Sequence, residues 1–213
     1  MIDKEAAFCN LMEKMDENKC PICAMVKFRM NEMMERFFYE NVNSPHLRYK
    51  IEKANGFCSR HAHKLLKQEN PLSHAILYHD FMYNVIHNVA DKKNKVAYDE
   101  HKGCFFCEGL NMNEEDYTKA FLEFFDNKDF KEKYISSSII CVPHLVAIRK
   151  LKFTNKKTVT SLTEETLKKY EVLNGHLSEV KRKSDYRYTN EEWTDEEKKS
   201  WKEAVDIFNG TEY

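Results

Sequence analysis

The chain has 213 residues, 42% of them hydrophobic, and its 34 basic and 35 acidic residues leave a net charge of −1. This composition allows a buried core and excludes a global electric field that attracts nucleic acid or an anionic membrane. Only 5 glycines and 4 prolines are present, which argues against a many-stranded sandwich and favours long helices.

The N-terminal residues lack the basic and apolar segments of a signal peptide, and no apolar run is long enough to span a bilayer. We therefore expect a soluble, cytoplasmic protein with no membrane partner. The reducing cytoplasm disfavours disulfides, so the seven cysteines need another explanation.

The first motif, Cys20-Pro-Ile-Cys23, opens a helix-forming run over 24–39, in which methionines and phenylalanines recur at three- and four-residue spacings. Ser44 before a proline predicts the N-cap of a short second helix over 45–54, which Gly56 ends. Cys58 leads into a third helix that carries His61. A fourth helix is predicted over 72–90, and the mostly polar stretch 91–102 is the predicted junction between two halves, 1–100 and 101–213.

The second half repeats this plan. Cys104 and Cys107 form another Cys-x2-Cys pair, and Cys141 with His144 forms another Cys-x2-His pair. The predicted helices cover 114–125, 128–134, 143–150, 164–182 and 195–208, and the last is expected to pack Trp201, Val205 and Phe208 on one side.

The two sets of motifs recur in the same order at a spacing of 83 or 84 residues. Apolar positions follow the same shift. A shift of 83 places Phe121 on Phe38, Phe130 on Leu47, Tyr134 on Ile51 and Ile140 on Phe57. Because chance rarely produces both agreements, we interpret the chain as an internal duplication.

Three thiolates and one imidazole are a ligand set typical of structural zinc. We expect each half to close one Cys3His site, so that Cys58→Ala unfolds the first half. The predicted metal ligands are Cys20, Cys23, Cys58, His61, Cys104, Cys107, Cys141 and His144. Both sites have four protein ligands and no open position, which favours a structural role over catalysis.

Some iron–sulfur clusters also use three cysteines and one histidine, so an electron carrier or redox sensor is the alternative. His63 competes with His61 as a ligand, but only His61 has a counterpart in the second half. Buried thiols and core histidines are the bland alternative for all eight residues, and they leave the matched spacings unexplained.

Two other features carry weaker hypotheses. His74, His79, Asp80 and His87 share one predicted helix and are candidates for an acid–base or second metal site, although an ordinary amphipathic helix explains them. Two basic clusters permit nucleic-acid binding, but solvated surface charge is favoured because acidic residues follow the second cluster. The clusters are Arg149, Lys150, Lys152, Lys156 and Lys157, then Lys181, Arg182, Lys183 and Arg187.

Several motifs together resemble a bacterial family known only as a domain of unknown function. They are Cys20–Cys23, Gly56–His61, Leu72–Tyr78, Ser184–Tyr188, Glu191–Trp193 and Trp201–Ala204. The second Cys pair lacks the proline of the first, so its equivalence depends on spacing alone. The resemblance supports the fold and the boundaries and implies no activity.

We thus expect an all-α protein of two pseudo-repeated halves, each organised around a Cys3His site. The favoured function is a zinc-stabilised binding or scaffolding protein for a protein or small-molecule partner, with catalysis disfavoured.

Overall fold

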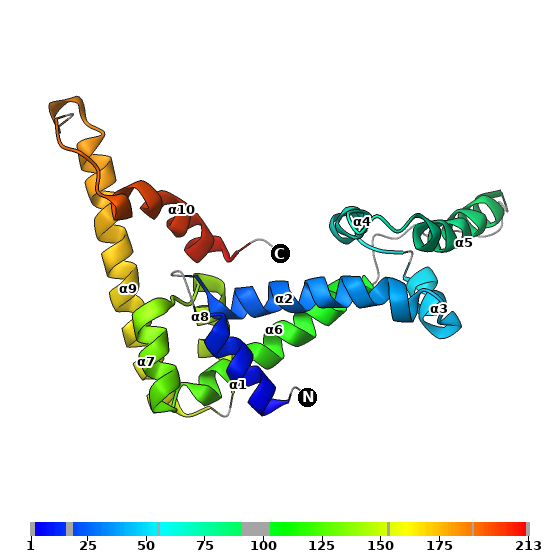
Figure 1. Cartoon of the computed structure of the whole chain (residues 1–213), viewed down its shortest axis with the longest axis horizontal. Helices are drawn as coiled ribbons and strands as arrows, with labels where there is room; N and C mark the ends of the chain where they lie inside the picture. Colours follow the sequence, from blue (N-terminus) through cyan, green and yellow to red (C-terminus); the bar gives the residue numbers. More distant parts are fainter. Residues whose placement is uncertain are drawn as a thin grey trace. The chain divides into compact units, whose positions relative to one another are not determined.

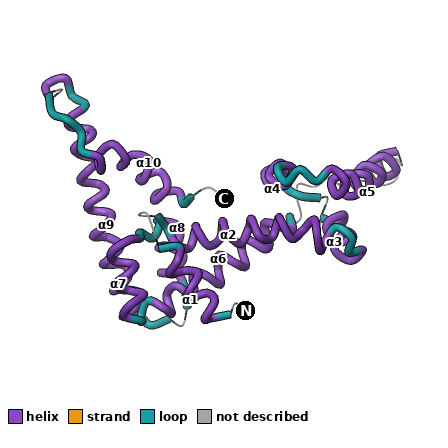
Figure 2. Tube along the Cα trace, in the orientation of Figure 1, coloured by secondary structure: helices purple, strands orange, loops and turns teal. Residues whose placement is uncertain are grey.

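The computed structural model describes residues 3–15, 19–54, 56–90, 103–152, 154–188 and 190–211. Over these residues the chain is helical and contains no strand, which confirms the all-α prediction (Figure 2). The stretch 91–102, predicted as the junction between the halves, lies outside the described residues, so the boundary at residue 100 stays a prediction.

The helices follow one another along the chain as labelled in Figure 1. They are α1 (Lys4–Glu13), α2 (Pro21–Arg36), the π-helical turn η1 (Phe37–Asn41), α3 (Pro45–Lys53), α4 (Ser59–Leu66), α5 (Pro71–Ala90), α6 (Phe105–Phe124), α7 (Lys128–Ser137), α8 (Val142–Lys150), α9 (Lys156–Lys183), the 3-10 turn η2 (Tyr186–Tyr188) and α10 (Asp195–Asn209).

The helices form two compact units that interleave in sequence. Unit 1 comprises Met1–Lys27 and Glu114–Tyr213, and unit 2 comprises Phe28–Asn113. The helices α2 and α6 each contribute to both units, since the divisions fall at Lys27 and Glu114.

In unit 1, an aromatic core joins α1, α6 and α7. The ring of Phe8 lies 5.2 Å from that of Phe124 and 5.5 Å from that of Phe130. Phe121 and Tyr134 are fully buried, with ring centroids 5.6 Å apart. Burial of such large side chains dominates the energetics of a small core.

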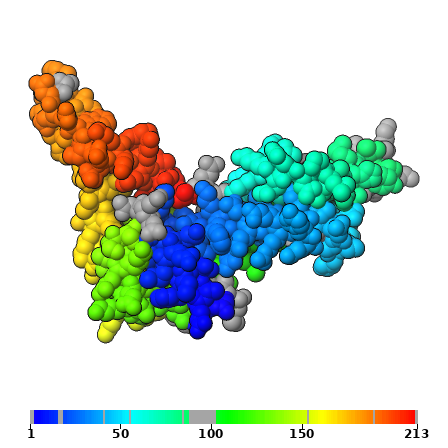
Figure 3. All heavy atoms as spheres, in the orientation of Figure 1, coloured from blue at the N-terminus to red at the C-terminus, as the bar shows by residue number. Residues whose placement is uncertain are grey.

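The long helix α9 ends at Lys183, and α10 returns alongside it and reaches α8 (Figures 1 and 3). A capping box starts α10: the Thr194 hydroxyl accepts a hydrogen bond from the Glu197 amide, and the Glu197 carboxylate accepts one from the Thr194 amide. Lys183 donates to the same buried carboxylate at 2.8 Å, which fixes the start of α10 on the end of α9.

This ion pair explains why one sequence prediction is wrong. Trp201, Val205 and Phe208 were expected to pack, yet they are 52%, 58% and 70% exposed. The helix buries Glu197 and Ile207 instead, because pairing Glu197 with Lys183 turns that face of α10 toward α9.

In unit 2, α2 and α6 lie side by side and antiparallel. A Cβ atom added at Gly109 of α6 would lie 2.7 Å from the Met33 sulfur of α2, so no larger residue fits without movement. Three residues earlier in α6, Phe106 meets Phe37, which lies four residues after Met33, with ring centroids 5.4 Å apart. The order of these contacts shows that the two helices run in opposite directions.

Most predicted helices appear with their ends shifted. The helix predicted from 114 begins at Phe105, and the helix predicted from 164 begins at Lys156. Helix α1 was not predicted, and its one clear signal is Asp3, whose side chain accepts from the Ala6 amide as an N-cap. Gly56 ends α3 with φ +87° and donates to the Ile51 carbonyl. Among the described helices, none combines the length and hydropathy that crossing a membrane requires.

Candidate metal centres

All four ligand motifs begin a helix in the same way. Cys58 and Cys141 are the N-cap residues of α4 and α8, while Cys20 and Cys104 stand immediately before the first residues of α2 and α6. The carbonyl of each of these cysteines accepts from the amide four residues later. The second ligand of every motif is therefore the third helical residue, whose side chain returns toward the N-cap. This geometry is the physical reason for the two-residue spacing.

The eight predicted ligands gather into two groups of four, each with donor atoms within 4.8 Å of one another. We define cluster I as Cys20, Cys23, Cys141 and His144, and cluster II as Cys58, His61, Cys104 and Cys107. Cluster I belongs to unit 1 and cluster II to unit 2, so each unit holds one Cys3His group, as predicted.

The pairing of the motifs, however, differs from the prediction. Each Cys-x2-Cys was expected to join the Cys-x2-His of its own half, but it joins that of the other half. Helix α2 explains why, because the stretch from Cys23 to the end of the helix at Arg36 carries the chain about 20 Å away before α3 and α4 follow. The antiparallel α6 begins beside the end of α2 and brings Cys104 there instead. Cys58→Ala consequently disrupts a group in unit 2.

In cluster I, Nδ1 of His144 faces three sulfurs. It lies 3.4 Å from the sulfurs of Cys20 and Cys23 and 3.0 Å from that of Cys141. The Sγ atoms of Cys23 and Cys141 are 3.6 Å apart, and all four residues are buried.

Cluster II repeats the arrangement. Nδ1 of His61 lies 3.2, 3.5 and 3.3 Å from the sulfurs of Cys58, Cys104 and Cys107. Cys58 and Cys107 have Sγ atoms 3.7 Å apart, and these two residues are half-buried. His61 and Cys104 are buried.

These distances match a single tetrahedral ion. Zinc bound to sulfur at about 2.3 Å and to nitrogen at about 2.0–2.1 Å requires donor–donor edges of about 3.6–3.8 Å. The separations of 3.6 and 3.7 Å between sulfurs have that length, and those between sulfur and nitrogen are somewhat shorter. The residues therefore fit one four-coordinate metal ion in each unit, whereas nothing in the geometry selects the element.

The two histidines differ in what lies behind the ring. Glu114 Oε1 is 3.0 Å from Nε2 of His144, at ion-pair distance although without the alignment of a hydrogen bond. Nε2 of His61 is buried and has no hydrogen-bond partner among the residues that the structure describes. The residue of α2 that corresponds to Glu114, at a shift of 84, is Met30, a buried apolar side chain.

Gly210, which follows α10, lies next to cluster I. Gly210 follows α10 with φ 81° and ψ 157°, a backbone conformation essentially restricted to glycine. A Cβ atom placed there would lie 3.7 Å from the Cys23 sulfur and 4.0 Å from the Cys141 sulfur. The backbone at Gly210 therefore lies against the sulfurs of cluster I.

Crowding of thiols shifts several pKa values in the metal-free protein. Burial raises the pKa of Cys20, whereas contacts with Cys141 and Cys20 lower that of Cys23. Burial opposes a charged His144, but its contacts with Cys141, Cys23 and Glu114 outweigh that effect and raise its pKa to about 11. A metal must displace these protons, so binding releases protons and weakens as the pH falls.

In cluster II, burial and the neighbouring Cys104 raise the pKa of Cys107 to about 12. Burial also acts on Cys104, but hydrogen bonds from His61 and from the amides of Cys58 and Cys107 outweigh it, so its pKa is lowered. The lowered pKa of Cys104 favours the thiolate form, as does its place at a helix start.

The competing histidines lie elsewhere. His63 is exposed and contacts the Ser59 carbonyl through Nδ1, outside cluster II. On α5, His74 contacts the Asn70 carbonyl, His87 contacts that of Tyr83, and Asp80 pairs with Arg48. His79 Nδ1 lies 3.5 Å from Asp80 Oδ1, but His74 and His87 contact backbone carbonyls instead, so the four candidates do not form one site.

The second basic cluster is largely paired. Arg182 binds Glu179 and Glu191, Lys183 binds Glu197, and Arg187 binds Asp185. Basic side chains that are already paired with carboxylates contribute less to the neutralisation of phosphates, so these ion pairs disfavour nucleic-acid binding at this cluster.

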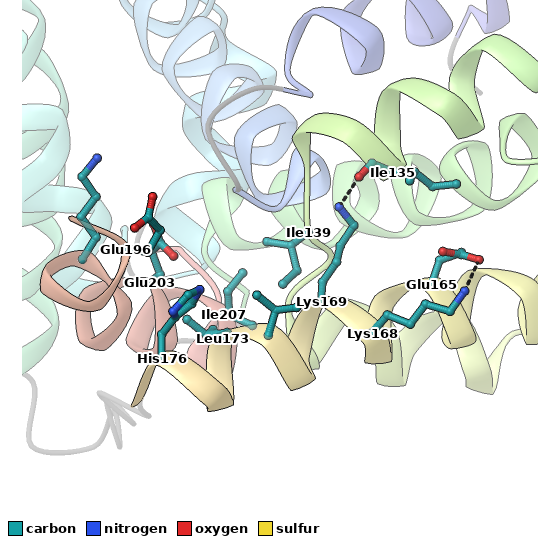
Figure 4. Close-up of a pocket in the computed structure, with 12 residues that line it drawn as sticks. Ile135, Ile139, Glu165, Lys168, Lys169, Leu173, His176, Glu196, Glu203 and Ile207 are labelled. Atoms are coloured by element: carbon teal, nitrogen blue, oxygen red, sulfur yellow. Dashed lines mark hydrogen bonds and ion pairs between the residues drawn. The ribbon is translucent and has the colours of Figure 1, made fainter. Parts of the chain in front are cut away.

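One further feature was not predicted, a cavity of about 500 Å³ in unit 1 between α7, α9 and α10 (Figure 4). Ile139, Leu173 and Ile207 form an apolar part of its lining, with Lys169 on one side of them and Glu203 beside His176 on the other. Lys169 donates to the Ile135 carbonyl at 2.6 Å, and burial lowers its pKa.

The model of a family described as "Family of unknown function (DUF6062)" matches residues 4–212 of the chain. The chain is also similar to a protein of Caldicellulosiruptor sp. (strain Rt8B.4) named "Uncharacterized 23.9 kDa protein in xynA 3'region". The two are 32% identical over 209 residues, which cover 95% of this chain and 100% of the relative. No solved structure matches the chain.

Proposed function

Because the chain belongs to the DUF6062 family of unknown function, we propose its role from its sites: a cytoplasmic scaffold or binding protein stabilised by two zinc ions. One observation carries the proposal. Both clusters offer four protein donors and their donor sets leave no position for water or substrate. Such closed sites stabilise folds, whereas catalytic zinc keeps an open position.

The donor spacing supports a single ion, as in the proposed zinc sites, over an iron–sulfur cluster. Ligands of a cluster bind different irons and therefore spread beyond the edge of one tetrahedron. In both groups all donors lie within 4.8 Å, and the closest sulfur pairs are 3.6 and 3.7 Å apart. That compactness suits one ion.

Matched helix starts support an internal duplication. Ser44 and Asn127 are the N-caps of α3 and α7, and Cys58 and Cys141 are those of α4 and α8. Each pair is separated by 83 residues, the repeat of the motifs. Of the eight apolar positions aligned by that shift, the structure buries all except Leu47. In this interpretation the copies exchange ligand pairs, so neither completes a site alone.

The cavity in unit 1 supports a binding role. Its volume of about 500 Å³ lies within the range of small-molecule sites, and apolar walls with a few polar groups are typical of such sites. The partner we propose is a small molecule held between Lys169 and Glu203. Exposed Trp201, Val205 and Phe208 on α10 offer an apolar surface to a protein partner.

The deciding experiment is elemental analysis with a visible spectrum, on protein purified without oxygen. About two zinc per chain without colour supports the proposal, since zinc is d10. Iron with sulfide and a broad absorption near roughly 400 nm would replace it with the alternative, a redox protein. The absence of any bound metal after reconstitution under reducing conditions would contradict both.

A further inference from the structure

We propose that cluster II is a site of peroxide modification, in which Cys58 and Cys107 form a disulfide and release the metal, while cluster I resists. This inference rests on the proposed zinc sites and adds a reaction to one of them. The peroxide is the oxidant, and the two sulfurs are the groups oxidised.

Accessibility is the first observation behind this difference. All four residues of cluster I are buried, and the backbone at Gly210 lies against the sulfurs of Cys23 and Cys141. In cluster II, Cys58 and Cys107 are half-buried. Oxidation of a thiolate follows its exposure, so a small neutral oxidant reaches cluster II first.

The second observation is that the two accessible residues are also neighbours. Their Sγ atoms are 3.7 Å apart, and a disulfide bond requires about 2.05 Å. Cys58 stands at the start of α4 and Cys107 in the first turn of α6, 49 positions apart in sequence. A resolving thiol so close to the oxidised one converts a sulfenic acid into a disulfide before further oxidation.

The third observation concerns the ligand that would remain. Within the described part of the chain, the buried Nε2 of His61 has no partner, whereas that of His144 has Glu114 Oε1 at 3.0 Å. A carboxylate behind a ligating histidine strengthens the metal site. Once two sulfurs are lost, Cys104 and an unsupported His61 are left, a two-ligand remnant that does not retain zinc.

The reaction balances as follows. One thiolate attacks the peroxide O–O bond, and with one proton this gives a sulfenic acid and water. The second thiolate attacks that sulfur, the S–S bond forms, and the departing hydroxide takes a proton to become water. Two thiolates, one hydrogen peroxide and two protons thus yield one disulfide and two waters, while zinc leaves as the divalent ion.

The test uses the full-length, zinc-loaded Cys9→Ser protein, because Cys9 is an exposed cysteine outside both clusters. Hydrogen peroxide is added at a few-fold excess, and a chromogenic chelator records released zinc. We expect one of the two zinc ions to leave at least about tenfold faster than the other. Peptide mass mapping should show a Cys58–Cys107 crosslink and unmodified Cys20, Cys23 and Cys141.

Several results would overturn the inference. Equal release of both ions, a first disulfide within cluster I, or a Cys104–Cys107 product contradicts it while leaving the zinc proposal intact. Protein that contains no zinc before peroxide is added contradicts both proposals together. A second variant, Cys107→Ser, removes the resolving sulfur, so Cys58 should accumulate as a sulfenic acid that dimedone traps. If that variant fails to fold, the crosslink mapped in the Cys9→Ser protein decides alone.

Discussion

Clusters I and II have the same donors, the same helix-start geometry and the same orientation of histidine, yet the chain surrounds them differently. Cluster I is fully buried, with Glu114 behind its histidine and Gly210 over its sulfurs. Cluster II has two half-buried cysteines and a histidine whose Nε2 meets no hydrogen-bonding partner in the described ranges. The donor residues alone would make the two clusters equivalent. We therefore expect their surroundings to cause any difference in metal affinity or in oxidation.

The largest expected effect tests which motifs belong together. In Cys58→Ala, loss of cluster II removes on the order of 10 kcal/mol of metal-binding free energy. We expect Cys104 and Cys107 to become reactive to iodoacetamide, whereas Cys20 and Cys23 stay protected. The matched variant Cys141→Ala should reverse the pattern. If Cys104 stays protected and Cys20 becomes reactive in Cys58→Ala, the motifs pair within each half instead.

A cut between the halves tests the same exchange without changing any ligand. A protease site inserted within 91–102 leaves two fragments, each with two donors for each cluster. With zinc present, the fragments should co-elute in size-exclusion chromatography, and a strong chelator should separate them. Fragments that separate while each retains its own zinc would show that no ligands are exchanged.

A smaller effect distinguishes the clusters by their supporting residues. Glu114→Gln removes the carboxylate behind His144 and should weaken zinc binding at cluster I about 10–100-fold. Met30→Leu is the matched control at the corresponding position of α2, and it leaves the charge around His61 unchanged. Chelator competition measures the two affinities. Equal weakening of both clusters in Glu114→Gln would argue for a general loss of stability.

The smallest effect concerns α10, whose end lies over cluster I. Lys183 lowers the pKa of Glu197, so their ion pair stabilises the folded protein above the usual pKa of glutamate. That contribution disappears as the pH falls through the lowered pKa of Glu197. The wild type should therefore lose more stability than Glu197→Gln between about pH 5 and pH 3. Thermal melts at matched zinc content measure the difference, and parallel losses would mean that the pair contributes nothing.

The sequence was sufficient to identify the eight residues that gather into the two clusters, and insufficient to predict which motifs pair. Two-residue spacing at a helix start is local, so Cys20 with Cys23 and Cys58 with His61 could be read directly. A duplicated chain offers two Cys-x2-Cys pairs and two Cys-x2-His pairs, and spacing does not distinguish the two ways of combining them. The antiparallel contact of α2 with α6, made by Met33 against Gly109, decides the matter and is a tertiary feature.

The residues that surround the clusters could not be predicted from the sequence either. Glu114 lies 30 residues before His144, and Gly210 lies 69 residues after Cys141, with no local pattern that links them. The outward face of α10 was misread for a related reason. Its apolar stripe was visible, but the buried partner of Glu197 is Lys183 on the preceding helix.

In sequence, cluster II lies inside cluster I: the residues of cluster II fall within 58–107, and those of cluster I fall at 20–23 and 141–144. A ribosome that delivers the chain from its N-terminus exposes four would-be ligands, Cys20 to His61, long before any site is complete. Cluster II becomes possible once Cys107 has emerged, and cluster I only after His144. The order of synthesis therefore completes the four residues of cluster II, the more exposed group, before those of the buried cluster I.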